Sequence, residues 1–258
     1  MTPLDDVGSE HLQQLLGVLS ETGGWLTRID PTRARTRPTA RSPMSRDDEL
    51  AYPYLVSHGA WSSLSHAVDH LRCLHTLLAD AKIIHMYAPY SLTRGAQENA
   101  CSAVWVLQPT SRHERVMRRL RIAVSDIQHG EKAWELTGAE RQRSESERLA
   151  EVADIAKRAD LTEKVKGVSY TEIVRDVGEP PNPVATAFSW RLCSGFAHGD
   201  LWPTLSAAER VELPDALPGM ASLAISADLQ MLLRVTMVAV ILVKRGWALY
   251  DQRCSPPY

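Results

Sequence analysis

The chain has 258 residues, of which 44% are hydrophobic and 23% are charged. This composition is ordinary for a globular protein and excludes a disordered chain, a collagen-like fibre and a disulfide-rich miniprotein. The formal net charge is −2, so no global field draws the chain to nucleic acid or to an anionic membrane, and such binding would need a local patch.

The cysteines and the apolar segments indicate where the protein resides. Four cysteines stand far apart, and none belongs to a C-x-x-C pair: Cys73, Cys101, Cys193 and Cys254. This spacing favours reduced thiols over a structural zinc site or a disulfide framework. The first residues lack the features of a signal peptide, and the longest apolar stretch, residues 235–243, is too short to span a bilayer. We therefore expect a cytoplasmic protein with no membrane segment.

The N-terminal part predicts a helix followed by an arm. Leucines at helical spacing in residues 9–20 indicate an amphipathic helix that ends at Gly23 and Gly24. Residues 27–50 contain three prolines, many arginines and few large apolar residues, which is typical of a linker or a surface arm. We expect an N-terminal helix and arm in residues 1–50 and a helical bundle domain in residues 51–258.

The rest of the chain predicts successive helices, and strand-like alternation is absent. Apolar periodicity and capping residues place the helices at about 57–82, 91–107, 111–136, 140–158, 170–177, 182–198 and 228–250. Ser111 and Glu114 have the spacing of a capping box, and residues 199–221, with several Gly and Pro, predict a loop. The sequence therefore predicts an all-α fold, a bundle of about six to eight helices with two long central hairpins.

The stretch SWRLCSGFAHGDLW, residues 189–202, carries the first candidate site. Arg191 and His198 are seven residues apart, which places them on one helical face about 10 Å apart, with Ser194 between them. Gly195 and its small neighbours would let another helix or a ligand approach closely. Gly199 is a candidate C-cap, which would leave His198 at the helix end.

This pattern resembles the signature of the HEPN superfamily, an Arg, four to six intervening residues and a His on a late helix of a helical bundle. The segment SGFAHG is similar to one in uncharacterised bacterial HEPN-like proteins. In those proteins an earlier helix often carries Arg-x-x-x-Glu, as Arg94 and Glu98 do here. The resemblance covers about residues 55–250 by helix order. The position after the Arg is usually polar in the family, and here it is Leu192.

The resemblance implies a function in RNA cleavage or RNA binding, as in a toxin or defence component. HEPN ribonucleases are dimeric and need no metal or other cofactor, and the Arg/His pair faces its counterpart across the interface. Arg191 would then stabilise negative charge on the phosphate. His198 would take the 2′-hydroxyl proton or protonate the leaving oxygen. Glu98 would be the third catalytic residue, and we expect a homodimer.

A second hypothesis is a helical small-molecule enzyme or binding protein. Its core pocket would gather Asp69, His70, Arg94, Glu98, Arg191 and His198. Buried charges need partners, so in such a pocket Glu98 would meet Arg191 or His198, and Arg94 would meet Asp69. In this arrangement Arg94, Asp69, His70 and Ser194 would bind the substrate. A purely structural interpretation, with a helix-end His and an Arg paired to Glu98, also stays open.

Two further patterns have structural and functional interpretations. His66 and His70 have the i, i+4 spacing of a metal pair, and Glu98 or Asp126 would have to complete the site. We favour a hydrogen-bonding role and no metal. On residues 111–136, four arginines form either a phosphate-binding stripe or a solvated face, and we favour the solvated face; they are Arg112, Arg115, Arg118 and Arg119. Most tryptophans are expected in the core.

Overall fold

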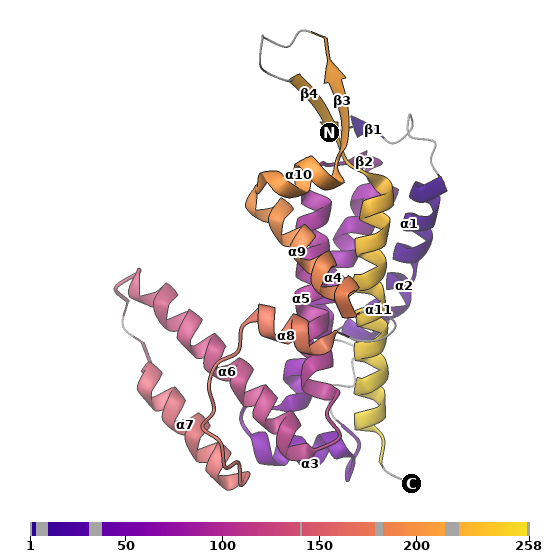
Figure 1. The fold of residues 1–258 in the computed structure, drawn as a ribbon. Helices are drawn as coiled ribbons and strands as arrows, with labels where there is room; N and C mark the ends of the chain where they lie inside the picture. The colour runs from indigo at the N-terminus through magenta and orange to yellow at the C-terminus, as the bar shows by residue number, and fades with distance from the viewer. Residues whose placement is uncertain are drawn as a thin grey trace. The chain divides into compact units, whose positions relative to one another are not determined.

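The computed structural model describes residues 2–3, 10–30, 38–139, 141–178, 183–214 and 222–256, and most of them are helical (Figure 1). The predicted all-α fold is confirmed. The chain divides into two compact units, and each consists of three chain segments. Unit 1 comprises Met1–Ala34, Ser65–Asn99 and Gly178–Val243, and unit 2 comprises Arg35–Leu64, Ala100–Val177 and Lys244–Tyr258. Three long helices contribute residues to both units: α4 (Val56–His75), α5 (Ala88–Leu107) and α11 (Leu229–Cys254).

Unit 1 is built around the C-terminal part of α4, the N-terminal part of α5 and most of α11. Its own helices are α1 (Glu10–Ser20), α2 (Thr22–Ile29), the π-helix η2 (Thr76–Asp80), α9 (Pro183–His198) and α10 (Leu201–Ala207). Two antiparallel strand pairs complete it, β1 (Thr2–Pro3) with β2 (Ile83–Ile84) and β3 (Glu209–Leu213) with β4 (Ser222–Ser226). Apolar side chains at helical spacing form its core, including Leu15, Leu19, Leu71, Leu74, Ala96, Leu192, Val235 and Ala239.

Unit 2 contains α3 (Pro43–Ala51), α6 (Arg112–Glu135), α7 (Glu145–Arg158) and α8 (Tyr170–Val177), and α6 packs against both α3 and α7. Its core includes Met44, Leu64, Trp105, Leu120, Ile127 and Ile155. The Trp105 indole Nε1 donates a hydrogen bond to Asp176 Oδ2 at 3.1 Å, so α8 is fixed against the end of α5. The side chains that hold this unit together are therefore both apolar and polar.

The helix boundaries agree with the periodicity to within a few residues, with four corrections. The first helix, expected to end at Gly23 and Gly24, ends at Ser20, and both glycines lie within α2. Residues 43–51, expected in an extended arm, form α3. Residues 199–221, expected as a loop, contain α10 and β3, and β3 pairs with β4. The short elements α2, α3 and α10 bring the helices of the described residues above the expected six to eight. These segments are too short or too polar to show a clear apolar stripe.

Serine side chains cap the starts of helices in unit 2, among them α6 and α7. Ser111 Oγ accepts a hydrogen bond from Glu114 N at 3.4 Å, as the capping box predicts, but the Glu114 carboxylate binds Arg118 Nε at 2.7 Å instead of completing the box. The complete box lies at the start of α7. There Ser144 Oγ accepts from Glu147 N, and Glu147 Oε2 accepts from Ser144 N at 2.8 Å.

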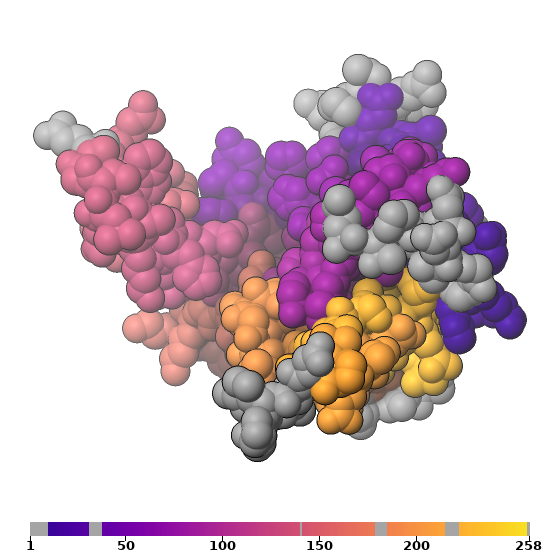
Figure 2. Space-filling view, turned by 90° about the horizontal axis from the view of Figure 1, so that it is seen from above, coloured from indigo at the N-terminus to yellow at the C-terminus, as the bar shows by residue number. Residues whose placement is uncertain are grey.

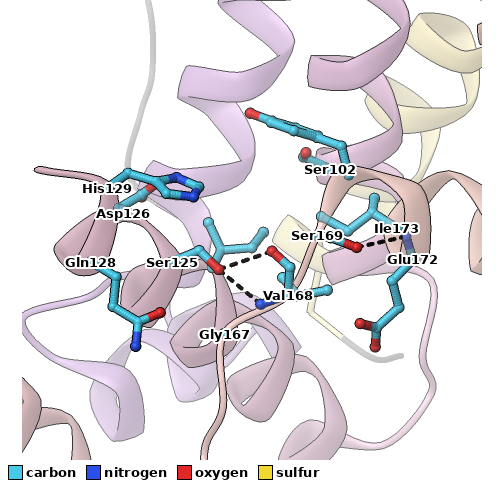
Figure 3. A pocket seen from close by; sticks show the side chains of 12 residues that line it. Ser102, Ser125, Asp126, Gln128, His129, Gly167, Val168, Ser169, Glu172 and Ile173 are labelled. Atoms are coloured by element: carbon cyan, nitrogen blue, oxygen red, sulfur yellow. Dashed lines mark hydrogen bonds between the residues drawn. The ribbon is translucent and has the colours of Figure 1, made fainter. Parts of the chain in front are cut away.

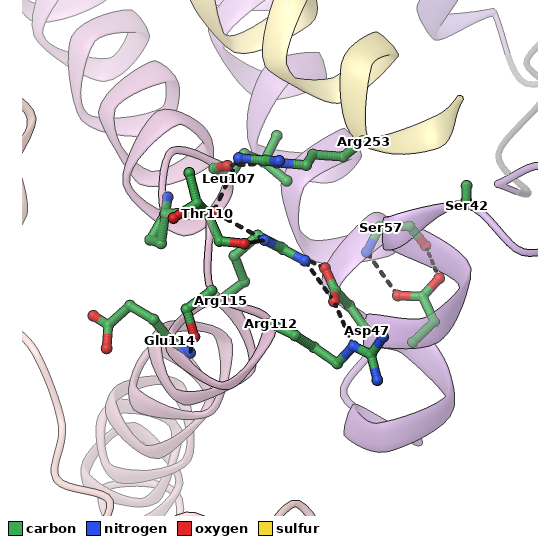
Figure 4. Close-up of polar contacts among 12 residues, drawn as sticks. Ser42, Asp47, Ser57, Leu107, Thr110, Arg112, Glu114, Arg115 and Arg253 are labelled. Atoms are coloured by element: carbon green, nitrogen blue, oxygen red, sulfur yellow. Dashed lines mark hydrogen bonds and ion pairs between the residues drawn. The ribbon is translucent and has the colours of Figure 1, made fainter. Parts of the chain in front are cut away.

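The arginines of α6 are structural, so the expectation of a solvated face is wrong (Figure 4). Arg115 is 3% exposed and binds the fully buried Asp47 through Nε at 2.6 Å and through Nη2 at 2.9 Å. Its Nη1 donates to the carbonyl oxygens of Pro109 and Thr110. Arg253 of α11 donates to Leu107 O and to Pro109 O. These bonds satisfy carbonyl groups at the end of α5 that have no helical partner.

The other arginines of this face also bind inside unit 2. Arg119 Nε donates to Leu55 O at 3.1 Å, and burial lowers the pKa of its guanidinium. Arg118 donates to Trp105 O and lies over the Trp105 ring. Arg112 Nε lies 3.8 Å from Asp47 Oδ1. Their charges are engaged with unit 2 itself, which argues against a phosphate-binding stripe.

Candidate functional site

A polar cluster of unit 1 joins α5 to α9. Arg94 Nε donates a hydrogen bond to Glu98 Oε1 at 2.9 Å, one helical turn away. Arg94 Nη1 lies 3.1 Å from His198 Nε2. The Trp190 indole Nε1 donates to the same Glu98 Oε1 at 2.8 Å. Three of the residues selected from the sequence, Arg94, Glu98 and His198, therefore meet in one hydrogen-bonded cluster.

The end of α9 places His198 at the surface. Gly199 has a φ of 76°, a left-handed conformation that a residue with a side chain adopts at a cost. Asp200 N donates to Gly195 O at 2.9 Å, and Gly199 N donates to Phe196 O at 3.3 Å. These two bonds form a Schellman motif, and the predicted C-cap role of Gly199 is confirmed. His198 is the last residue of the helix and is exposed.

Arg191 is exposed on the same helix, and its guanidinium carbon lies 5.9 Å from the centre of the Trp190 ring. Within the described residues, Arg191 has no carboxylate partner. Trp190 thus contacts Arg191 through its ring and Glu98 through its indole N–H. Ser194, predicted between Arg191 and His198, is partly exposed.

The expected network of paired charges around Glu98 and Arg94 forms, but with different partners. Glu98 was expected to meet Arg191 or His198, but its described hydrogen bonds come from Arg94 and Trp190, and Arg94 is the residue that binds His198. Arg94 was expected to meet Asp69. Among the described residues it binds Glu98 and His198 instead, and Asp69 is exposed. Arg191, His198 and Asp69 lie at the surface, so the six residues of the second hypothesis do not line a closed core pocket.

His70 has a packing role on α4. Its Nδ1 lies 2.7 Å from His66 O, so this nitrogen carries the proton and donates to the carbonyl. The ring covers Gly95, where a Cβ atom would collide with His70 Nε2 and Cδ2. His66 is exposed. In the part of the chain that the structure describes, no group of three or more His, Cys, Asp or Glu side chains is arranged to hold a metal ion.

Gly195 packs within its own chain. A Cβ atom there would lie 2.6 Å from Pro203 Cγ and 3.0 Å from Trp202 Nε1, both on α10. The close approach that its small size permits is therefore used by α10. Ala197 stays exposed on the same helix.

Gln97 is a buried positioning residue that sequence reasoning missed. Its Nε2 donates to Ser189 Oγ on α9 at 2.5 Å and to Val235 O on α11 at 2.9 Å, and its side chain is fully buried. Gln97 therefore fixes α5 against α9 directly beside Glu98. The available signal was a Gln within an otherwise apolar helical face, since a buried amide needs hydrogen-bond partners.

Unit 2 has a separate polar pocket of about 630 Å³ (Figure 3). It lies between α6, the segment 167–169 and the start of α8, and Ser102 of α5 also lines it. Ser125 Oγ holds this segment by donating to Val168 O at 2.9 Å and accepting from Val168 N at 2.8 Å. Asp126 and His129, one turn apart on α6, line the pocket, and burial raises the pKa of Asp126. This pocket could not be predicted from the sequence, because the segment that precedes α8 has no apolar periodicity.

Neither the helices nor the known proteins point to a function for this chain. Within the described ranges, no helix has the combined length and apolar character needed to cross a bilayer. No known family model, curated protein or solved structure matches this chain significantly. The function of this chain must therefore be inferred from its own residues and their geometry.

Proposed function

We propose that this protein binds and cleaves RNA without a metal ion, using His198, Arg94 and Arg191, with Glu98 as a positioning residue. The observation that carries the proposal is the exposed His198 imidazole bonded to Arg94, with the exposed Arg191, which has no carboxylate partner among the described residues, on the same helix. A polymer cannot enter a closed core pocket, so a nuclease needs these groups at the surface. The HEPN-like pattern of the sequence supports the same chemistry.

The hydrogen bonds support a role for each of these side chains in the proposed reaction. Arginine has five N–H donors, and Arg94 uses two of them in the described contacts, toward Glu98 and His198. The remaining donors and Arg191 would bind a phosphate group. Since Arg94 donates to His198 Nε2, a neutral His198 carries its proton on Nδ1. When Arg94 turns to the phosphate, Nε2 becomes free to accept the 2′-hydroxyl proton, and the imidazolium can then protonate the leaving oxygen.

Glu98 holds the guanidinium of Arg94 in place. Its Oε1 accepts from both Arg94 Nε and Trp190 Nε1, and its side chain is 14% exposed. In Glu98→Gln the negative charge is lost, so the pair with Arg94 is weakened while the shape is retained. We expect this variant to lose nearly as much activity as His198→Ala.

The experiment measures cleavage of a fluorescent single-stranded RNA with and without EDTA. The parent chain should cleave in EDTA, and His198→Ala should be slower by about 10²–10⁴-fold, the usual contribution of a general acid or base. Arg112→Ala, whose side chain binds Asp47 in unit 2, is the control and should retain activity. Loss of cleavage in EDTA, or full activity in both His198→Ala and Glu98→Gln, would refute the proposal.

The same proposal includes a homodimer in the cytoplasm, as the HEPN resemblance implies, with the two Arg/His pairs lining one groove. The exposed Ala197 and the partly exposed Ser194 lie on the helix that would face the partner. If the rate of RNA cleavage falls with the square of the protein concentration on dilution, the active form is a dimer, which would support this arrangement. Cleavage by a monomer at full specific activity would contradict it.

A further inference from the structure

The β3–β4 hairpin of unit 1 lies outside the apolar core. All five residues of β3 are exposed, and the orange atoms of this part of the chain lie at the surface in Figure 2. Val211 and Leu213 are 65% and 43% exposed, although valine and leucine are usually buried. Among the described residues, β3 pairs only with β4. A two-stranded hairpin is marginally stable in water on its own, so this exposed apolar edge points to a partner strand.

The two charged residues in the middle of β3, Arg210 and Glu212, lie opposite apolar residues of β4. Arg210 lies opposite Ile225, and Glu212 lies opposite Leu223. Neither charge has a described ionic partner, whereas Glu209 accepts a hydrogen bond from Ser226 Oγ at 3.1 Å. Arg210 and Glu212 alternate with Val211, so they share one face of the hairpin, and Val211 points to the other.

The sequence Glu209-Arg-Val-Glu-Leu213 is complementary to itself in an antiparallel arrangement. If a second β3 runs antiparallel with the two-fold axis at Val211, Arg210 of each copy lies directly opposite Glu212 of the other. On the other face, Val211 meets its own equivalent, with Leu213 of both copies nearby. Opposite charges and apolar residues directly across antiparallel strands stabilise the pairing. The edge of β4 carries no charged residue, so it has no comparable electrostatic preference.

We infer that the β3 edge binds a second copy of this chain, so that the two hairpins form one four-stranded antiparallel sheet. Such a contact is isologous, since each copy contributes the same surface, and backbone hydrogen bonds between the two edges supply part of the affinity. The strands are short, so the contact belongs among small, transient interfaces. It is independent of RNA cleavage and uses neither Arg191 nor His198.

The test uses charge reversal in the full chain and measures molar mass by sedimentation equilibrium at about 10–300 μM, the range of a small interface. The molar mass of the parent chain should rise with concentration through the β3 contact, to a dimer if β3 is the one contact and to larger assemblies if the proposed α9 dimer also forms. Arg210→Glu and Glu212→Arg, each alone, place like charges opposite each other twice per dimer and should weaken dimerisation about tenfold or more. The double variant Arg210→Glu/Glu212→Arg restores both pairs and should dimerise like the parent.

Mixing the two single variants gives the sharpest result, because one copy then has two acidic and the other two basic residues at these positions. We expect heterodimers to exceed either homodimer, as measured by native mass spectrometry. All variants should keep the parent's helical circular dichroism, since β3 lies outside the core. A parent chain that is monomeric throughout the range, or a dimer insensitive to the single reversals, would overturn the inference.

Discussion

Asp47 and Arg115 carry opposite charges inside unit 2, and neither is accessible enough to be solvated. If Asp47 is removed, the guanidinium of Arg115 keeps two carbonyl acceptors but loses its counter-charge. Breaking a buried ion pair in this way costs about 3–5 kcal/mol. We therefore expect Asp47→Ala to lower the free energy of unfolding by roughly that amount, measured by urea denaturation.

The matched control is Asp69→Ala, because Asp69 is an exposed residue of the same type on α4. Exposed substitutions of this kind usually change stability by less than about 0.5 kcal/mol. If the two variants unfold at the same urea concentration, the buried pair does not stabilise unit 2.

Asp126 predicts a pH dependence with a definite sign. Burial raises the pKa of Asp126 above the ordinary 3.8 in the folded state. At pH values between these two pKa values, the folded chain therefore binds more protons than the unfolded chain. The Asp126 contribution to stability should therefore fall as the pH rises from about 3.8 through the raised pKa, and then stay constant. Asp126→Asn removes the charge and should be more stable than the parent at neutral pH.

Thermal unfolding of both chains from pH 3.5 to pH 7 measures this difference. The gap between Asp126→Asn and the parent should widen with pH. Asp154→Asn, on an exposed position of α7, is the control and should follow the parent. A gap that narrows with rising pH would mean that Asp126 is stabilised as a carboxylate.

Single residues also mark the limit of sequence reasoning. Spacing correctly placed Arg94 and Glu98 on one turn and His198 at a helix end, because these relations are local. The pairing of Asp47 with Arg115 joins residues far apart in sequence. No periodicity reports such a contact, so Arg115 was assigned to a solvated face. Gln97 was missed for the same reason, since its partners lie on α9 and α11.

At the scale of elements, the end of α9 depends on one glycine. Gly199→Ala forces a side chain into a left-handed conformation, which costs about 1 kcal/mol, and it should loosen the helix end that carries His198. We expect a lower melting temperature together with slower RNA cleavage. Thermal unfolding and the RNA assay on the same preparation measure both effects.

Gly17→Ala on α1 is the control, because a Cβ atom there would meet nothing within 4 Å. In a helix this change usually stabilises by about 0.5–1 kcal/mol, so its melting temperature should rise and its cleavage should be unchanged. A stable Gly199→Ala with normal activity would show that the Schellman motif does not position His198.

Long helices were predictable and short elements were not. An amphipathic helix such as α4 repeats its apolar pattern over several turns, so its position can be read from the sequence. The β3–β4 hairpin was missed for two reasons: β3 alternates between polar and apolar residues over only four positions, Arg210 to Leu213, and β4 shows no regular alternation. The helix α3 contains only two large buried groups, Met44 and Asp47, and one of these is charged.

At the scale of the whole molecule, two buried cysteines report on the two units. Cys193 belongs to unit 1 and Cys101 to unit 2, and both side chains are fully buried. Burial raises the pKa of the Cys193 thiol, and alkylating reagents attack the thiolate. Because α4, α5 and α11 run through both units, we expect both cysteines to become reactive at the same urea concentration.

Mass spectrometry of alkylated peptides across a urea series measures this. The exposed Cys73 should react without urea and serves as the internal control. If Cys193 is alkylated at a urea concentration that leaves Cys101 protected, the units unfold separately and a two-state analysis of the whole chain does not apply.

Because the segments of the two units alternate along the chain, they affect both how the protein is translated and how it can be divided into fragments. Each unit combines an early, a middle and a late segment of the chain, and unit 1 is incomplete until residue 243. The helices α4 and α5 therefore emerge from the ribosome before the late segments that cover their apolar faces. During most of translation the nascent chain must be protected from aggregation. No single cut in the gene separates the two units. The proposed function must accordingly be tested with point variants, because truncated fragments would remove part of both cores.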